Sequence, residues 1–161
     1  MPKDPPRPEP PEPPELRFFA RLTIRVDAPV ETGTIGSERH RIIHITGGTV
    51  EGPRIRGEIL PAGADFQVIR SETATDLLAK YAIRTEDDEV LIVENVGVRT
   101  ASPADVERIA AGLPVPPERV YFRCVPRLIG SGAWSWVEDR VFVGAGQRFP
   151  DRVQVDVFEV A

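Results

Sequence analysis

The sequence has very few of the residues that usually supply redox, metal or nucleophilic chemistry. One cysteine and two histidines occur in 161 residues, which excludes a disulfide framework within the chain and gives no reason to expect a metal site or a cofactor. The N-terminus has no long apolar run, so we expect no signal peptide and no membrane segment, and predict a cytoplasmic protein. Basic residues are outnumbered, with 20 Lys and Arg against 25 Asp and Glu and a net charge of -5. This balance argues against a broad nucleic-acid-binding surface.

Proline, in contrast, is abundant, and much of it lies at the N-terminus. Residues 1–15 read MPKDPPRPEPPEPPE, where proline alternates with charge and almost nothing can be buried. The composition predicts a disordered, semi-extended polyproline tail. Hydrophobic residues make up 41% of the chain, enough for one core, so we predict a single domain over residues 16–161.

Apolar and polar residues alternate through most of that domain. The alternation from Leu16 to Asp27 is typical of a strand with one apolar face. Further strands are predicted at residues 39–46, 53–60, 66–70, 77–85, 90–98, 119–125, 134–137, 140–143 and 152–160. One short helix is expected between Ser102, a suitable N-cap, and Gly112, because Pro103 and Asp105 fit its first turn. The pattern predicts an all-β fold, a closed antiparallel barrel of about ten strands with one short helix, rather than a sandwich.

The stretch TGGTVEGPRIRGEIL, residues 46–60, has two glycines at the spacing of a phosphate-binding loop. Pro53 and Arg54 stand where such a loop needs lysine and a hydroxyl residue, and the residues that follow alternate like a strand instead of opening a helix. We therefore interpret the glycines as a turn between two strands, not as a nucleotide site.

Three other candidate motifs also fail on their spacing or context. His40 and His44 lack the glutamate of a zinc helix and would lie about 13 Å apart on a strand. Cys124 shares a strand face with Phe122, which predicts packing as a small apolar residue instead of catalysis. Ser131 is not in a nucleophile elbow.

Several segments, in order along the chain, resemble one family. They are ITGGTVEGPRIRGEILPAGADF, YFRCVPRL, WSWVEDRVFVGAG and VQVDVFEV. Together they resemble the bacterial and fungal family known as domain of unknown function 3237, over residues 16–160. The resemblance implies a calycin-like antiparallel barrel with a pocket at its mouth and no generally established activity. The chain departs from the family pattern at Phe66, where tryptophan is more common, at Glu89, where glycine is usual, and at Glu138, where asparagine is usual.

Polar residues on otherwise apolar strands are the candidates for a site, because alternate residues of barrel strands converge on the lumen. As catalytic residues we expect Glu51 and Asp65, two carboxylates bordering one mouth, faced by Arg123. As ligand-binding residues we expect Phe66, Tyr81, Arg84, Glu94, Tyr121 and Trp136. The alternative is structural: Arg84 and Arg123 would pair with Asp65 or Glu94 to close a barrel end.

These residues predict a barrel that binds a small, partly apolar organic molecule, aromatic or polyketide-like, with acid–base chemistry such as isomerisation, elimination or ring closure as an extension. The competing interpretation is a non-catalytic structural or protein-interaction module. We also expect a homo-oligomer, most simply a dimer, because Phe19 stands on the polar face of the first strand without an obvious core partner.

Overall fold

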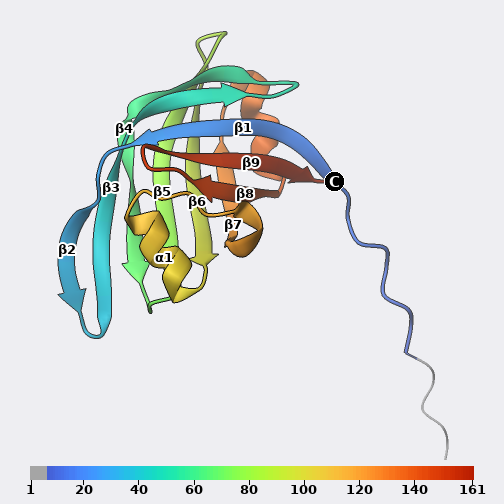
Figure 1. Ribbon diagram of the computed structural model, residues 1–161. Helices are drawn as coiled ribbons and strands as arrows, with labels where there is room; N and C mark the ends of the chain where they lie inside the picture. Colours follow the sequence, from blue (N-terminus) through green and yellow to red (C-terminus); the bar gives the residue numbers. More distant parts are fainter. Residues whose placement is uncertain (1–6) are drawn as a thin grey trace, which may run out of the picture.

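The computed structural model describes residues 7–161, and strands make up most of it (Figure 1). The strands are β1 (Leu16–Val26), β2 (Val30–Ile35), β3 (Glu38–Glu51), β4 (Arg56–Ile69), β5 (Ala74–Thr85), β6 (Val90–Thr100), β7 (Tyr121–Ile129), β8 (Phe142–Arg148) and β9 (Arg152–Val160). The helices are α1 (Pro103–Ala110) and the 3-10 helices η1 (Pro117–Arg119) and η2 (Gly132–Asp139). Residues 7–15 of the predicted tail are exposed and form no helix or strand, while residues 1–6 lie outside the described part of the chain.

The sheet closes on itself as an antiparallel barrel. Its order is β1-β9-β8-β7-β6-β5-β4-β3-β2, and β1 also pairs with the second half of β3, so eight strands form the barrel and β2 lies outside it on the first half of β3. The prediction of a closed antiparallel barrel is therefore confirmed. Every barrel strand has two hydrogen-bonded neighbours, which removes the exposed edges that an open sheet would have.

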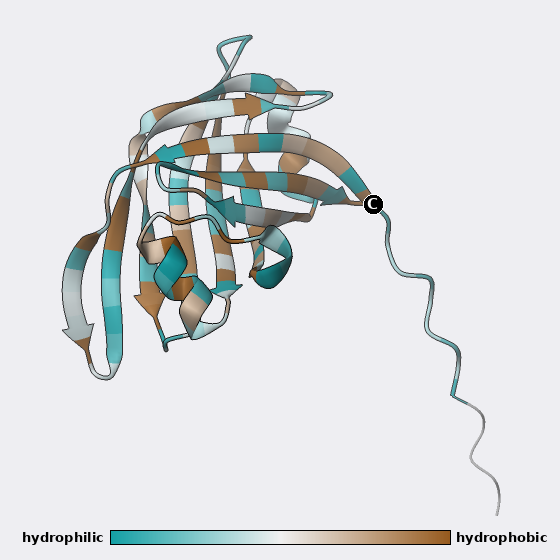
Figure 2. Ribbon diagram, viewed as in Figure 1, coloured by the Kyte–Doolittle hydropathy of each residue, from teal (hydrophilic) through white to brown (hydrophobic). Residues whose placement is uncertain are grey.

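Hydrophobic and hydrophilic residues alternate along the barrel strands, as the stripes in Figure 2 show, and burial alternates with them most regularly along β7. The core lines the lumen and includes Leu22 on β1, Val50 on β3, Ile83 on β5 and Val157 on β9, all at most 3% exposed. Gly144 and Gly146 on β8 leave room for large neighbours: a Cβ on Gly146 would lie 2.5 Å from the Phe122 ring. The period of two that the sequence shows is thus the period of burial.

Bulges explain where the structure departs from the predicted elements. Gly47 and Gly48 lie inside β3, with φ of 135° and 153°, at an irregularity in the pairing of β3 with β4. The segment around Gly63, with φ of 131°, is likewise an irregularity inside β4. Of the glycines that we interpreted as turns between strands, Gly52 does lie in the turn between β3 and β4. For Gly47, Gly48 and Gly63 the interpretation was wrong, because each lies at a bend within one long strand that lets it curve around the barrel. A Cβ on Gly48 would also collide with the Thr23 carbonyl oxygen.

Two further elements differ from the prediction. The segment predicted as a strand at residues 134–137 is part of η2, and β2 was not predicted at all. Every residue of β2 is exposed, so it lacks the apolar alternation by which a strand is recognised. Residues 7–161 therefore contain nine strands, not the ten that we predicted.

Phe19 is buried, contrary to our expectation. A bulge between Phe18 and Ala20 in the pairing of β1 with β9 inserts one extra residue, and Phe19 turns into the core at 2% exposure. Its ring packs at 5.1 Å from the ring of Phe142. The residue on which we based the homo-oligomer is therefore not available for a contact between subunits.

Helix α1 begins and ends as predicted. The Ser102 hydroxyl accepts a hydrogen bond of 3.2 Å from the backbone N–H of Asp105, and Gly112 follows the helix with φ of 72°. The Asp105 carboxylate also accepts hydrogen bonds from Arg119 of η1. This ion pair lowers the pKa of Asp105 and ties α1 to the segment before β7.

Candidate active site

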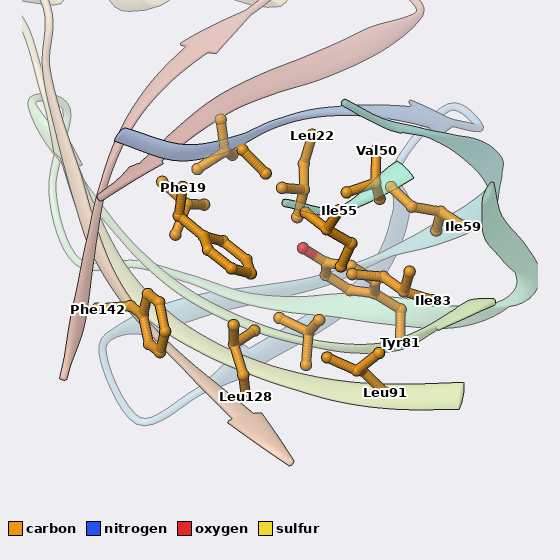
Figure 3. Close-up of a cluster of buried hydrophobic side chains, with 14 of the residues drawn as sticks. Phe19, Leu22, Val50, Ile55, Ile59, Tyr81, Ile83, Leu91, Leu128 and Phe142 are labelled. Atoms are coloured by element: carbon orange, nitrogen blue, oxygen red, sulfur yellow. The ribbon is translucent and has the colours of Figure 1, made fainter. Parts of the chain in front are cut away.

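The two ends of the lumen differ in polarity. One end is packed with apolar side chains, shown in Figure 3, that include Ile55, Ile59, Leu91 and Leu128. Tyr81 lies among them at 3% exposure, and burial raises the pKa of its hydroxyl. Side chains fill the lumen at this end.

Helix η2 lies against the same apolar end. Trp136 packs on the rings of Phe19 and Phe142, with centroids 6.1 and 6.3 Å away. The guanidinium of Arg54 lies 4.6 Å from the Trp136 centroid and donates a hydrogen bond of 2.8 Å to Glu159, a buried carboxylate on β9. The predicted ligand-binding residue Trp136 is thus part of the side-chain packing that closes this end of the lumen.

The opposite end is polar and hollow. A cavity of about 480 Å³ lies there, between the ends of the strands and α1, whose place across this end is visible in Figure 1. Its walls combine apolar residues with arginines and a threonine: Ala28, Pro29, Glu31, Arg39, Arg41, Ile69, Thr75, Arg99, Ala101, Val106, Ile109, Ala110, Gly112, Arg148 and Pro150. This mixture of apolar walls and a few polar groups is typical of small-molecule sites.

A chain of hydrogen bonds runs inward from this cavity along the lumen. Arg41, on its wall, donates from Nε to Oε1 of Gln67 at 2.7 Å, and Gln67 donates from Nε2 to Oδ2 of Asp65, also at 2.7 Å. The other carboxylate oxygen of Asp65 accepts from the backbone N–H of Leu78 at 3.2 Å. Asp65 is therefore held in one orientation by two uncharged donors.

The environment of Asp65 is unusual for a carboxylate. Burial raises its pKa, while the hydrogen bonds from Gln67 and Leu78 and the attraction of Arg99 and Arg41 oppose the change. Burial prevails because no arginine among residues 7–161 comes close enough to Asp65 to form a direct ion pair. A raised pKa makes this carboxyl group a better proton donor and acceptor for acid–base chemistry than an exposed carboxylate.

Of the predicted catalytic residues, only Asp65 lies inside the barrel at this end. Its register partner on β3 is the buried Ile43. Glu51 pairs with Arg21 on the outer surface and follows the inward Val50. Arg123 follows the inward Phe122, and its guanidinium lies 5.4 Å from the Tyr121 ring centroid.

The structure therefore does not bring Glu51, Asp65 and Arg123 together. On β3, Glu51 is eight positions from the partner of Asp65, a separation of about 26 Å along an extended strand. The expectation that two carboxylates border one mouth was wrong, since Glu51 points outward at the opposite end.

Most of the predicted ligand-binding residues also point away from the lumen. Phe66 is 49% exposed and Tyr121 is 55% exposed on the outer surface. Arg84 pairs with Glu58 at 3.7 Å and with Asp88 at 3.5 Å. The alternative hypothesis, in which Arg84 pairs with Asp65 or Glu94 to close a barrel end, was also wrong, because Glu58 and Asp88 are the acids beside Arg84.

Glu94 has its own partners on the outer face. Its carboxylate lies 3.1 Å from the ammonium of Lys80 and 3.7 Å from the guanidinium of Arg127. Apolar residues of the same strand lie on both faces of the sheet, because the outer face also carries apolar residues. Apolar neighbours along the strand therefore do not place Glu94 in the lumen.

Sequence reasoning missed the residues that line the polar end. Arg41, Gln67, Arg99 and Arg148 were not selected, although strand parity places Arg41 on the same face as Ile43. That parity is visible in the sequence. It could not be used because an arginine in a strand is normally solvated, and only the closed barrel shows that this face is interior.

Comparison with known proteins places the chain in a family. The family model described as "Protein of unknown function (DUF3237)" matches residues 14–160. The chain belongs to the DUF3237 family. A UPF0311 protein of Rhodopseudomonas palustris is 41% identical over 147 residues, covering 91% of this chain and 96% of that protein.

Solved structures share the fold of this DUF3237 protein. A Rhodopseudomonas palustris protein of unknown function has a TM-score of 0.87 at 40% identity, covering 92% of this chain and 98% of that one. A β-barrel-like protein of Acinetobacter baumannii has a TM-score of 0.81 at 30% identity, covering 94% and 98%. An enzyme from Penicillium herquei has a TM-score of 0.71 at 14% identity, covering 96% and 99%, which shows likeness of fold alone.

Residues 7–161 lack two other structural features. No three His, Cys, Asp or Glu side chains there gather as metal ligands would. None of the helices in that range has the length and apolar character needed to cross a membrane.

Proposed function

We propose that this DUF3237 protein binds a small organic molecule in the cavity beneath α1, and that the molecule extends inward from the cavity wall past Arg41 and Gln67 to Asp65, which transfers a proton to or from it. The observation that carries the proposal is the cavity itself, about 480 Å³ at the polar end of an otherwise filled lumen. That volume is within the range of ligand sites. Apolar walls from Val106 and Ile109 suit the partly apolar ligand that the sequence predicts.

Native mass spectrometry of the freshly purified full-length chain tests the binding. We expect a retained small molecule that is lost when Ala110, on the cavity wall, is replaced by phenylalanine. Ala104→Phe is the matched control, because Ala104 is exposed on the same helix and is not part of the cavity wall. A molecule that stays bound in Ala110→Phe, or that leaves equally in both variants, would place binding elsewhere.

Proton transfer by Asp65 rests on its orientation and its burial. Gln67 and the Leu78 N–H fix the carboxylate, and burial raises its pKa. When the retained molecule is incubated with protein in D2O, we expect deuterium at one carbon with the natural chain and none with Asp65→Asn. If Asp65→Asn binds the molecule and exchanges deuterium equally fast, Asp65 is not the proton-transfer group and the protein is a binding module.

The competing function, protein interaction, is favoured by one feature of the outer surface. Phe66, Leu78, Val96 and Val125 form a row of register partners across four adjacent strands, each 49% to 58% exposed. The neighbouring row carries both signs of charge, in Lys80, Glu94 and Arg127. A second copy of this chain can offer such a face both apolar contact and opposite charges, so we propose a homodimer through this row.

A further inference from the structure

Of the four arginines on the wall of the cavity beneath α1, Arg39 pairs with Glu31, and the other three come from distant strands. Arg41 comes from β3, Arg99 from β6 and Arg148 from β8, and all three line its wall. Each belongs to an inward-facing row of its strand: Arg99, for example, is the register partner of the buried Phe122 and of the buried Thr75. The barrel therefore directs three guanidinium groups toward one space.

Burial and mutual repulsion make this arrangement unfavourable without a counter-charge. Burial lowers the pKa of all three arginines. For Arg99 the pKa falls to about 10, first through burial and then through the charges of Arg41 and Arg148. A group with that pKa still carries its positive charge at neutral pH, so the charges remain in place and repel one another.

The protein supplies little to balance these charges. Arg41 donates to Gln67 at 2.7 Å, and Arg148 donates to the Arg152 carbonyl oxygen at 3.3 Å. Glu31, the acid on the cavity wall, pairs with Arg39 at 3.5 Å. Within residues 7–161 Asp65 forms no ion pair with these arginines, and its charge opposes only part of the lowering of the pKa of Arg99 and Arg148 that burial causes.

Arg99 is the extreme case. Only 9% of its surface is exposed, and among residues 7–161 its side chain has no hydrogen-bond partner and no ion-pair partner. A buried guanidinium has five N–H donors to satisfy and is almost never left alone inside a protein. Here its donors line a cavity large enough for a ligand.

We infer that the molecule bound in this cavity is an organic anion, whose carboxylate or phosphate group is held by Arg99 with Arg41 and Arg148. The inference rests on the proposed binding function and adds the chemical class of the ligand. The planar fork of a guanidinium matches the oxygens of such groups and forms charge-assisted hydrogen bonds with them. The apolar part of the ligand lies against Val106 and Ile109 of α1.

Benzoate and benzamide form a matched pair of probes, since they share shape and differ in charge. We expect benzoate to bind the natural chain at least about 10-fold more tightly than benzamide by calorimetric or NMR titration, because a charge-assisted pair replaces a neutral one. Arg99→Met should remove this preference, and Arg99→Lys should keep part of it. Arg84→Met, on the outer surface at the other end, is the control and should change neither affinity.

The thermal stability of the same variants separates a binding role from a structural one. If the role of Arg99 is to bind an anion, Arg99→Met removes an unpaired buried charge from the ligand-free protein and raises its melting temperature. A lower melting temperature together with unchanged benzoate binding would show a structural arginine and overturn the inference.

The outcomes also separate the inference from the proposed function. If benzamide binds as tightly as benzoate and Ala110→Phe blocks both, the cavity binds small molecules but does not select anions. If neither probe binds and mass spectrometry finds no retained molecule, both the inference and the proposed function fail.

Discussion

Arg54 and Glu159 form an ion pair of 2.8 Å across the barrel end beside η2, in which the carboxylate is buried and the guanidinium is half exposed. The same guanidinium stacks on the Trp136 ring. Among the described residues, Glu159 has one other cationic neighbour, Arg140 at 3.6 Å. The pair therefore connects the segment before β4 with β9 and with η2.

Arg54→Met is expected to lower the free energy of unfolding by about 2 kcal/mol, because it leaves a buried carboxylate with a single, longer ion pair. Methionine keeps apolar contact with Trp136, so the loss reports the charge. Arg17→Met is the control: Arg17 is exposed and lies 3.8 Å from Glu15, and its change should stay below about 0.5 kcal/mol. Urea unfolding measures the free energy of unfolding of both variants. Equal losses in Arg54→Met and Arg17→Met would show that the pair of Arg54 and Glu159 does not stabilise the barrel.

Gly146→Ala is expected to destabilise the fold by about 2 kcal/mol, because the new Cβ would lie 2.5 Å from a ring atom of the buried Phe122. Phe122→Leu, which removes that ring, should offset part of this loss. A double-mutant cycle in urea measures the coupling between the two positions. If the two changes simply add, the close approach is relieved by some other movement and the explanation fails.

Asp65→Asn should change stability in a pH-dependent way. Burial raises the pKa of Asp65 in the folded state, above the unfolded value of about 3.9. Below that pH both states are protonated and the carboxyl costs nothing. As the pH rises through the folded pKa, the charged form disfavours the fold, so Asp65→Asn should be neutral near pH 3 and stabilise by up to about 1 kcal/mol at pH 7.

Asp105→Asn is the control, because its effect on stability should depend on pH in the opposite direction. Its ion pair with Arg119 lowers the pKa of Asp105, so this carboxylate contributes stability that is present above the unfolded pKa and lost as the pH falls through the folded pKa. Chemical unfolding between pH 3 and 7 should show the two variants diverging in opposite directions. Parallel curves would contradict both assignments.

Cys124 should resist thiol reagents while the protein is folded. It is 3% exposed, and burial raises the pKa of its thiol, so both access and thiolate formation are suppressed. We expect reaction with an aromatic disulfide reagent at pH 8 to be at least about 100-fold slower than in denaturant, where the thiol has its ordinary reactivity. Fast reaction of the folded protein would mean that β7 opens locally, since its pairing with β8 is confined to two residue pairs.

The apolar row on the outer surface predicts a dimer. Multi-angle light scattering at high micromolar concentration should give twice the chain mass of 17.8 kDa, and Leu78→Lys should give the monomer mass, because a charge would then be buried in the contact. Val90→Lys is the control, since Val90 is exposed to 46% but lies outside the row. A monomer for the natural chain, or a dimer that survives Leu78→Lys, would exclude this interface.

The sequence by itself determined the class of fold, because alternation is a local property. Strand periodicity, the Ser102 cap and the glycine after α1 each depend on residues within a few positions of one another, and the structure contains most of the elements they predict. The same local signals also excluded a phosphate loop at residues 46–60, which form parts of β3 and β4.

Tertiary structure decided the site and the packing of the core, because the three facts behind them are not local. Closure of the barrel through β1 and β3 determines which parity of each strand is interior, and so separates Asp65, which points in, from Glu51 and Arg123, which point out. The bulge at Phe19 reverses that parity within one strand, which no alternation pattern reveals. The convergence of Arg41, Arg99 and Arg148 on one cavity depends on bringing together strands far apart in the chain, and arginines that look solvated in the sequence become buried only when the barrel closes around them.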